Sequence, residues 1–100
     1  MHLISYDIEN DRLRLKVSKH LQRWGLHRVQ YSVFMGSVEK QNFPKLRQEL
    51  AGYAQRQEWA GTDSILIVPI HQKLLKSIEV FGSWPDRWEE ITGEKNTLMM

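Results

Sequence analysis

The chain has 100 residues, no cysteine and a formal net charge of +2. A chain of this length forms one domain with one core, and it has no volume to spare for a deep internal cavity. We therefore expect any extended active site to be shallow or to lie between subunits. Without cysteine, the sequence excludes a disulfide framework, a thiolate zinc site and a cysteine nucleophile.

Apolar runs in the sequence are short. The longest covers residues 65–70, and a membrane-spanning helix needs roughly 20 apolar residues. The first seven residues lack the basic flank and the length of a signal peptide. We expect a soluble, cytoplasmic protein with no membrane contact.

Charge is distributed unevenly along the chain. Residues 1–11 contain three acids and no base, whereas residues 12–38 contain six bases and no acid. A positive block of this kind predicts a polyanionic partner such as a nucleic acid. The alternative is an ordinary solvated surface.

The amino-terminal part of the chain predicts a strand followed by a helix. Residues 2–8 are mostly apolar and aromatic, as in a strand. Asp11 stands where a helix cap belongs, and the run that follows has no glycine or proline until Gly25. We predict a helix that is capped by Asp11 and ends at Trp24.

This helix has two distinct faces. Its apolar residues are spaced four, four and three apart, which places them on one face. They are Leu13, Val17, Leu21 and Trp24. Four bases lie nearly opposite, and we call them the basic ridge. The ridge consists of Arg12, Lys16, Lys19 and Arg23. We predict that it binds nucleic acid, while Arg14, at the flank of the apolar face, leans toward the sheet.

Residues 28–38 alternate in the manner of a strand. The pattern places Val29, Tyr31, Val33 and Met35 on one side and Arg28, Gln30, Ser32 and Phe34 on the other. Gly36 predicts a bulge or a kink. The segment is therefore either one bent strand or a strand followed by a short second one.

The later elements complete the predicted fold. Residues 42–57 have apolar positions three and four apart and Pro44 in the first turn, which predicts a second helix. Residues 64–70 are apolar on both faces, as in a central strand, and residues 77–82 predict another short strand. The order indicates an α+β, ferredoxin-like sandwich, with two helices on one face of a mostly antiparallel sheet.

The residues after position 82 differ in composition from the rest. We predict a domain over residues 1–82 and a carboxyl-terminal tail over residues 83–100. Trp84 and Trp88 lie in this tail, and exposed aromatic clusters usually mark contact surfaces. They either fold back on their own domain or dock on a partner, and we expect the partner.

The most informative candidate for chemistry is Asp7. The sequence has no phosphate loop, nucleophile elbow or paired-histidine metal motif, and we interpret its four scattered histidines as structural or solvated. Asp7 ends the first strand on the side of Leu3 and Ser5, where a carboxylate is costly unless it is paired or binds a cation. It is therefore a strand-end cap, a salt-bridge partner of Arg14 or Arg28, or a metal ligand.

One aspartate makes a poor magnesium site, because Mg²⁺ needs six oxygen ligands. Two copies of Asp7, brought together in a symmetric dimer, make a better one. The neighbouring strand face can then supply a cation from Arg28, a hydroxyl from Ser32 and an aromatic ring from Phe34 for a nucleic-acid strand. For Phe34 alone, we expect core packing instead.

These segments together resemble a known family. Residues 3–8 (LISYDI), the basic helix and residues 28–36 (RVQYSVFMG) resemble the small universal subunit of CRISPR spacer acquisition, described as a CRISPR-associated endoribonuclease or endonuclease. Residues 64–70 and 78–82 are similar to its third and closing motifs. The resemblance covers roughly residues 2–82.

The resemblance implies a ferredoxin-like homodimer whose carboxyl-terminal strand is exchanged with the partner. It also implies a Mg²⁺ ion held by Asp7 of both chains and a metal-dependent nuclease activity. The residues that match the family's functional motifs are Tyr6, Asp7, Arg14, Arg28, Ser32 and Phe34. Lys16 stands where some members have arginine.

Three functions are compatible with this sequence. The first is a dimeric scaffold that binds duplex DNA together with the larger CRISPR integrase subunit during spacer acquisition. The second is a Mg²⁺-dependent nuclease that acts on duplex DNA or single-stranded RNA. The third is a non-catalytic ferredoxin-like regulatory or protein-interaction domain. We favour the scaffold.

Overall fold

The computed structural model describes residues 1–93 of the chain. In chain order, its elements are β1 (His2–Asp7), α1 (Asp11–Arg23), β2 (His27–Gln30), β3 (Val33–Gly36), α2 (Phe43–Tyr53), β4 (Ser64–Pro69), the 3₁₀-helix η1 (Gln72–Ser77) and α3 (Trp88–Thr92). No helix in this part of the chain is long and apolar enough to cross a membrane.

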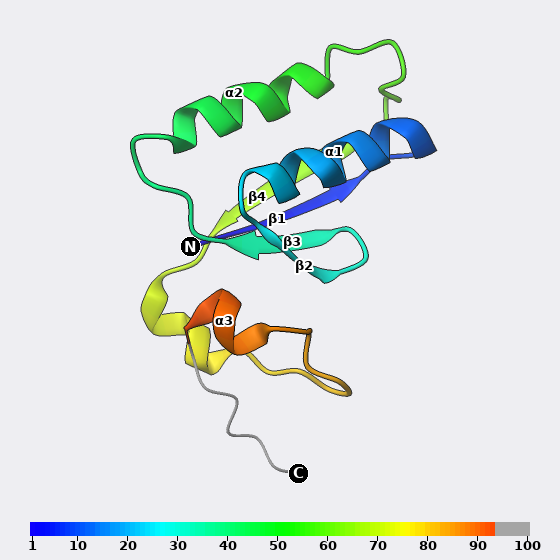
Figure 1. Ribbon diagram of the computed structural model, residues 1–100. Coiled ribbons are helices and arrows are strands. Elements are labelled where there is room, and N and C mark those ends of the chain that lie inside the picture. Colours follow the sequence, from blue (N-terminus) through cyan, green and yellow to red (C-terminus); the bar gives the residue numbers. More distant parts are fainter. Residues whose placement is uncertain (94–100) are drawn as a thin grey trace.

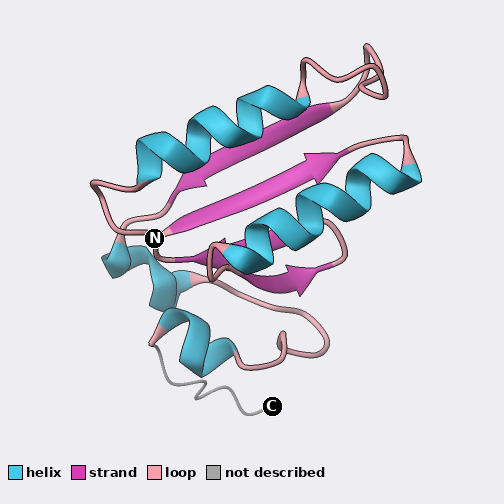
Figure 2. Cartoon of the chain, turned by 45° about the horizontal axis from the view of Figure 1, so that its top comes forward, coloured by secondary structure: helices cyan, strands magenta, loops and turns pink. Residues whose placement is uncertain are grey.

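The strands form one antiparallel sheet in the order β2-β3-β1-β4. The helices α1 and α2 lie side by side on one face of it (Figures 1 and 2). This arrangement confirms the predicted α+β, ferredoxin-like sandwich. The central strand β1 pairs on both sides, so its residues are fixed between β3 and β4.

A core fills the space between the sheet and these two helices. It contains Ile4, Tyr6, Ile8, Leu13, Val17, Leu21, Leu26, Phe34, Phe43, Leu46, Leu50 and Tyr53. The apolar positions of α1 that recur at helical spacing are among these residues, because a helix on a sheet buries one face. Phe34 is fully buried, which confirms its predicted place in the core.

The ends of the helices differ from the predicted ones. The N-cap of α1 is Asn10, not Asp11: its side chain accepts a hydrogen bond from the backbone N–H of Leu13 at 2.9 Å. Asp11 is instead the first helical residue and pairs with Arg14. The helix α2 ends at Tyr53 rather than at residue 57, because residues 54–57 are exposed and bury no side chain that would stabilise a further helical turn.

Residues 27–36 form a tight hairpin of two strands. The chain turns at Tyr31 and Ser32, and the register shifts between Arg28 and Gln30. The second alternative, two short strands, is therefore the one found. The turn and the shift interrupt the simple alternation that the sequence predicted.

The predicted bulge or kink at Gly36 is wrong. Gly36 is the last residue of β3 and pairs in register with His2. A Cβ atom at this position would lie 3.1 Å from the Cα of Leu26. Glycine is needed here because two backbone segments approach closely.

The segments η1 and α3 lie on the opposite side of the sheet from α1 and α2 (Figure 1), and a second core fills the space between them and the sheet. Its buried residues are Met35, Leu75, Trp88 and Ile91, with Trp84 partly buried against them. The expectation that the two tryptophans dock on a partner is thus wrong for these side chains, which fold back on their own domain. The predicted division at residue 82 stays a prediction, and residues 94–100 of the tail lie outside the described residues.

The strand predicted over residues 77–82 is not formed in this chain. Ser77 ends η1, and the residues after it pair with no strand within the described part of the chain. Leu75 explains the difference, because η1 turns the chain under the sheet to place this side chain in the second core. The exchange of this segment between two chains stays a prediction.

Candidate nucleic-acid interface

The basic ridge lies on the outer surface of α1. All four of its side chains are exposed, while the opposite face of the helix is buried against the sheet. Within residues 1–93, none of the four forms an ion pair with an acid. Four positive charges along about three helical turns are therefore available to a polyanion.

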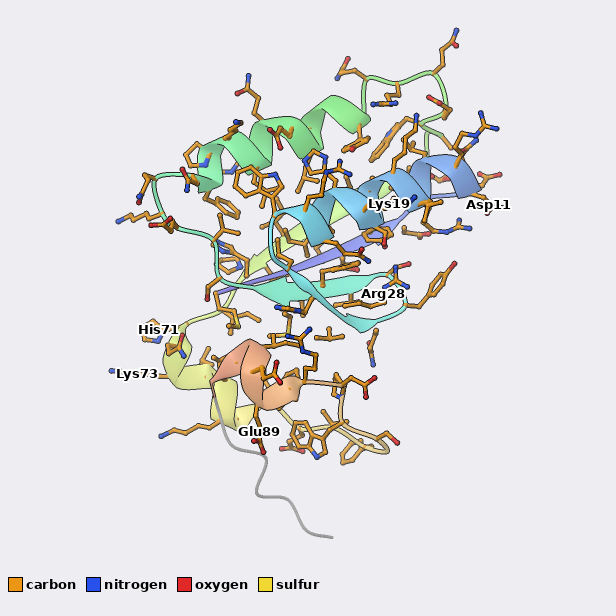
Figure 3. The ribbon with its side chains drawn as sticks, viewed as in Figure 1. Asp11, Lys19, Arg28, His71, Lys73 and Glu89 are labelled. Atoms are coloured by element: carbon orange, nitrogen blue, oxygen red, sulfur yellow. The ribbon has the colours of Figure 1, made fainter. Side chains whose placement is uncertain are left out.

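A shallow depression lies beside this helix, between α1 and the β2–β3 hairpin. It has a volume of about 310 Å³, and we call it the arginine pocket. It is lined by Tyr6, Asp11, Arg14, Leu15, Ser18, Arg28 and Tyr31. Figure 3 shows Arg28 on the hairpin, next to the helix that carries Lys19. Two guanidinium groups from distant parts of the sequence thus meet in one depression.

Arg28 is the one of these two arginines whose charge is not compensated by a carboxylate in the described part of the chain. Its Nη2 donates a hydrogen bond to Oγ of Ser18 at 2.6 Å. Its guanidinium carbon lies 5.3 Å from the ring centroid of Phe34 and 5.9 Å from that of Tyr31. No carboxylate pairs with Arg28 in the described part of the chain. Its charge is therefore held in place without being neutralised.

Arg14 hydrogen-bonds to the backbone directly after β1, which agrees with the predicted orientation of its side chain toward the sheet. Its Nη1 donates to the carbonyl oxygen of Ile8 at 2.7 Å, and its Nη2 pairs with Asp11. The hydrogen bonds to the Asp11 carboxylate and, second, to the Tyr31 hydroxyl raise the pKa of Arg14. Arg14 thus fixes the β1–α1 junction and presents a partly compensated charge to the pocket.

Three further predicted site residues lie in or near the pocket: Tyr6, Ser32 and Phe34. Tyr6 is buried and its ring stacks with that of Phe34 at 6.2 Å between centroids. The backbone N–H of Tyr6 donates to the carbonyl oxygen of Ser32 at 3.0 Å. Tyr6 lines the pocket, whereas Phe34 lies in the core beneath Arg28. Ser32 occupies the hairpin turn rather than a strand position beside Arg28.

Asp7 is separated from the arginine pocket. Residues of β1 alternate between the two faces of the sheet: Tyr6 belongs to the helix-side core and Leu3 to the second core. Asp7 therefore shares the face of Leu3, as predicted, and is exposed. Within residues 1–93 it has no side-chain partner, so the salt bridge to Arg14 or Arg28 is not formed.

The described residues contain no cluster of three or more histidine, cysteine or acidic side chains that could hold a metal. Asp7 can thus supply one ligand from this chain. A divalent cation at Asp7 would need further protein ligands, and the described residues of this chain place none beside it.

The sequence predicted no place in the site for four of the residues that line the pocket: Asp11, Leu15, Ser18 and Tyr31. The strand alternation predicts that Tyr31 lies on the face opposite Arg28, but the hairpin turn brings the two side chains together. Ser18 follows Val17 on the buried side of α1 and is 3 % exposed. A hydroxyl among buried apolar residues is a signal in the sequence, because such a group needs a hydrogen-bond partner.

A cluster of bonded side chains joins α1 to α2 next to the ridge residue Arg23. Oε1 of Glu49 accepts hydrogen bonds from Nε1 of Trp24 at 2.8 Å and from Nε2 of His20 at 2.7 Å. The other ring nitrogen of His20 lies 2.9 Å from the Tyr53 hydroxyl. These groups satisfy one another, so His20 has the structural role expected of it.

This cluster leads to a prediction on pH. The hydrogen bonds from Trp24 and then from His20 lower the pKa of Glu49 below its ordinary value of 4.5. A lowered pKa stabilises the folded state above that value, and the stabilisation is lost as the pH falls through the folded-state pKa. The wild-type protein should therefore melt at a higher temperature than Glu49→Gln at about pH 5.5, with a difference that becomes smaller as the pH falls below the ordinary pKa of 4.5. A constant difference in thermal melts over this range would contradict the assignment.

Comparison with known proteins agrees with this fold and these motifs. Residues 1–78 match the model of the family CRISPR associated protein Cas2. The chain is 37 % identical over 91 residues, 88 % of its length and 82 % of the relative's, to the CRISPR-associated endoribonuclease Cas2 of Desulforudis audaxviator. It is 34 % identical over 85 residues, 85 % of its length and 87 % of the relative's, to CRISPR-associated endoribonuclease Cas2 3 of Synechocystis.

A solved structure has a similar fold. The crystal structure of hypothetical protein TT1823 from Thermus thermophilus superposes with a TM-score of 0.63 and 28 % identity, covering 84 % of this chain and 92 % of that chain. The family model spans the first strand, the basic helix, the hairpin and the strand β4. The chain therefore belongs to the CRISPR associated protein Cas2 family.

Proposed function

We propose that this protein is a dimeric scaffold of CRISPR adaptation, which binds duplex DNA and holds the larger integrase subunit. The observation that carries the proposal is the basic ridge: four exposed bases on one helix face, none of them paired with an acid within residues 1–93. Contacts of such a surface with phosphates are independent of sequence, as a scaffold for varied spacers requires. Membership of the family supports the same role.

The part of the sheet that η1 and α3 leave uncovered supports a homodimer. On this face Ser5 pairs with Leu66, and Asp7 pairs with Ser64. Leu66 is 59 % exposed, and Phe81 beyond the sheet is 94 % exposed. Large apolar side chains at this exposure favour contact with another protein surface. In the proposed dimer, the second copy covers this face, and the segment around Phe81 is exchanged.

The arginine pocket adds a phosphate contact to the proposed interface. Arg28 has N–H donors that Ser18 does not use, and Tyr31, 70 % exposed, offers a ring face for a base. The same groups suit duplex DNA through its phosphates and single-stranded RNA through stacking.

Nuclease activity is the second candidate, and the unpaired Asp7 carboxylate favours it. Asp7 of the two chains would hold a Mg²⁺ ion at the dimer interface. When bound, such an ion stabilises negative charge on phosphate oxygens and lowers the pKa of a bound water. The chain's own contribution would be to bind and orient the nucleic acid through the ridge and Arg28.

Spacer integration by the larger subunit tests the scaffold directly. With this protein present, we expect integration of a duplex into a CRISPR array, and none when it is omitted. Asp7→Asn should support integration at the wild-type level, because the scaffold needs the ridge and not the metal. Integration that proceeds equally without the protein would overturn the scaffold role. No affinity for nucleic acid at moderate salt would instead favour a regulatory or protein-interaction domain.

A further inference from the structure

Ser18 is a polar residue in an apolar place. The buried residues of α1 are Leu13, Val17, Ser18 and Leu21, and Ser18 is the one that carries a hydroxyl. A buried hydroxyl costs free energy unless it is hydrogen-bonded. Its partner is Nη2 of Arg28, ten residues further along the chain and on another element, at 2.6 Å.

Loss of this hydrogen bond would affect the stability of the fold less than the orientation of Arg28. Arg28 is exposed overall, so water can satisfy its N–H groups if the serine is removed. An alanine at position 18 would suit an apolar helix face and has a higher helix propensity than serine. The hydrogen bond is therefore worth little to the fold, and its main consequence is the orientation of the guanidinium.

Three contacts together fix that orientation. Ser18 from α1 holds one Nη, the Phe34 ring from β3 lies 5.3 Å from the guanidinium carbon, and the Tyr31 ring from the turn lies at 5.9 Å. A guanidinium has five N–H donors in a planar fork, and one edge is taken by Ser18. Arg28 is one of the residues that line the arginine pocket, and no carboxylate pairs with its other donors in residues 1–93.

We propose that Ser18 is a positioning residue, which orients Arg28 so that its free donors meet a phosphate of the bound nucleic acid. A neutral hydroxyl is suited to this role, because it fixes the fork without cancelling its charge. Arg14 shows the contrast, since Asp11 holds it and compensates its charge. The inference rests on the proposed function, in which the pocket contacts a phosphate.

A double-mutant cycle tests the proposal. We would measure the dissociation constant for a short blunt DNA duplex at low salt with the full chain, Ser18→Ala, Arg28→Gln and the double variant. Ser18→Ala should weaken binding about fivefold when Arg28 is present and should have no effect when Arg28 is Gln. Its melting temperature should be unchanged or higher. Ser37→Ala, at an exposed serine after β3, is the matched control and should leave binding unchanged.

Two results would overturn the positioning role. One is an equal loss of binding from Ser18→Ala in both backgrounds, which would show that it does not act through Arg28. The other is unchanged binding by Ser18→Ala while Arg28→Gln weakens it, which leaves the proposed function intact.

A nuclear magnetic resonance measurement separates this inference from the proposed function. In the free protein, the held guanidinium should give separate Nη resonances for Arg28, and these should merge in Ser18→Ala. If the unaltered protein binds no nucleic acid, the proposed function fails. Separate resonances that merge would still support the role of Ser18 in holding Arg28, and resonances that are already merged in the wild type would overturn it.

Discussion

Reversing the charge of all four basic-ridge residues is expected to abolish duplex binding. In Arg12→Glu/Lys16→Glu/Lys19→Glu/Arg23→Glu, phosphate contacts become repulsions, and affinity at low salt should fall by at least about a hundredfold. Four phosphate contacts also contribute about −3.6 to the slope of log affinity against log salt concentration. That contribution should disappear from the titration. Fluorescence anisotropy of a labelled duplex over a salt series measures both quantities.

A matched variant separates the ridge from net charge. Four exposed bases on other segments, Lys40, Arg56, Lys73 and Lys76, can be reversed to give the same change in charge. This control should lose much less affinity and keep most of its salt slope, because its charges do not lie along one helix face. The ridge is not the binding surface if both variants lose affinity equally, or if the ridge variant binds as the wild type does.

Asp7→Asn is expected to remove metal-dependent cleavage of RNA or duplex DNA. The change keeps the shape of the side chain and removes the charge that a divalent cation requires. We expect a decrease in the cleavage rate of at least about a hundredfold in Mg²⁺. The stability should hardly change, because Asp7 is exposed and has no partner within residues 1–93. Cleavage assays with highly purified protein, together with sedimentation to test for the proposed dimer, measure these effects.

The control for this experiment is Asp86→Asn, at an exposed aspartate far along the chain from β1. It should cleave at the wild-type rate. Cleavage by Asp7→Asn at the wild-type rate would show that the activity arises from a contaminant or from a mechanism without this carboxylate. Loss of the dimer in Asp7→Asn would assign the residue to assembly instead of catalysis.

The two experiments address different faces of the molecule. The basic ridge and the arginine pocket lie on the helix side of the sheet, whereas Asp7 lies on the opposite side with Leu3 and Ser5. Asp7→Asn should therefore leave duplex affinity unchanged. Charge reversal on the ridge should weaken both binding and cleavage, because cleavage requires bound substrate. Within a single chain, Asp7 and Arg28 thus lie on opposite faces of the sheet and do not form one site.

Most of the fold could be predicted from the sequence because its elements depend on near neighbours. The spacing of Leu13, Val17 and Leu21 determines the buried face of α1, and the same periodicity determines the exposure of the ridge. Alternation in β1 placed Asp7 on the side of Leu3. These properties follow from 3.6 residues per helical turn and two per strand repeat. The errors at Asp11 and at residue 57 are element boundaries, where one capping hydrogen bond or one missing contact decides the result.

The composition and the local spacing thus determined the sheet-and-helix architecture, the positive face of α1 and the candidate carboxylate. Only the tertiary structure decided which distant residues meet. It brought Ser18 to Arg28, joined His20 to Glu49, and buried Trp88 in one core with Met35, where the sequence predicted a partner contact. The physical reason is that an apolar or polar side chain has many compatible partners at the level of sequence. Packing of the complete chain selects one of them, since each buried group must fill space and satisfy its hydrogen bonds at the same time.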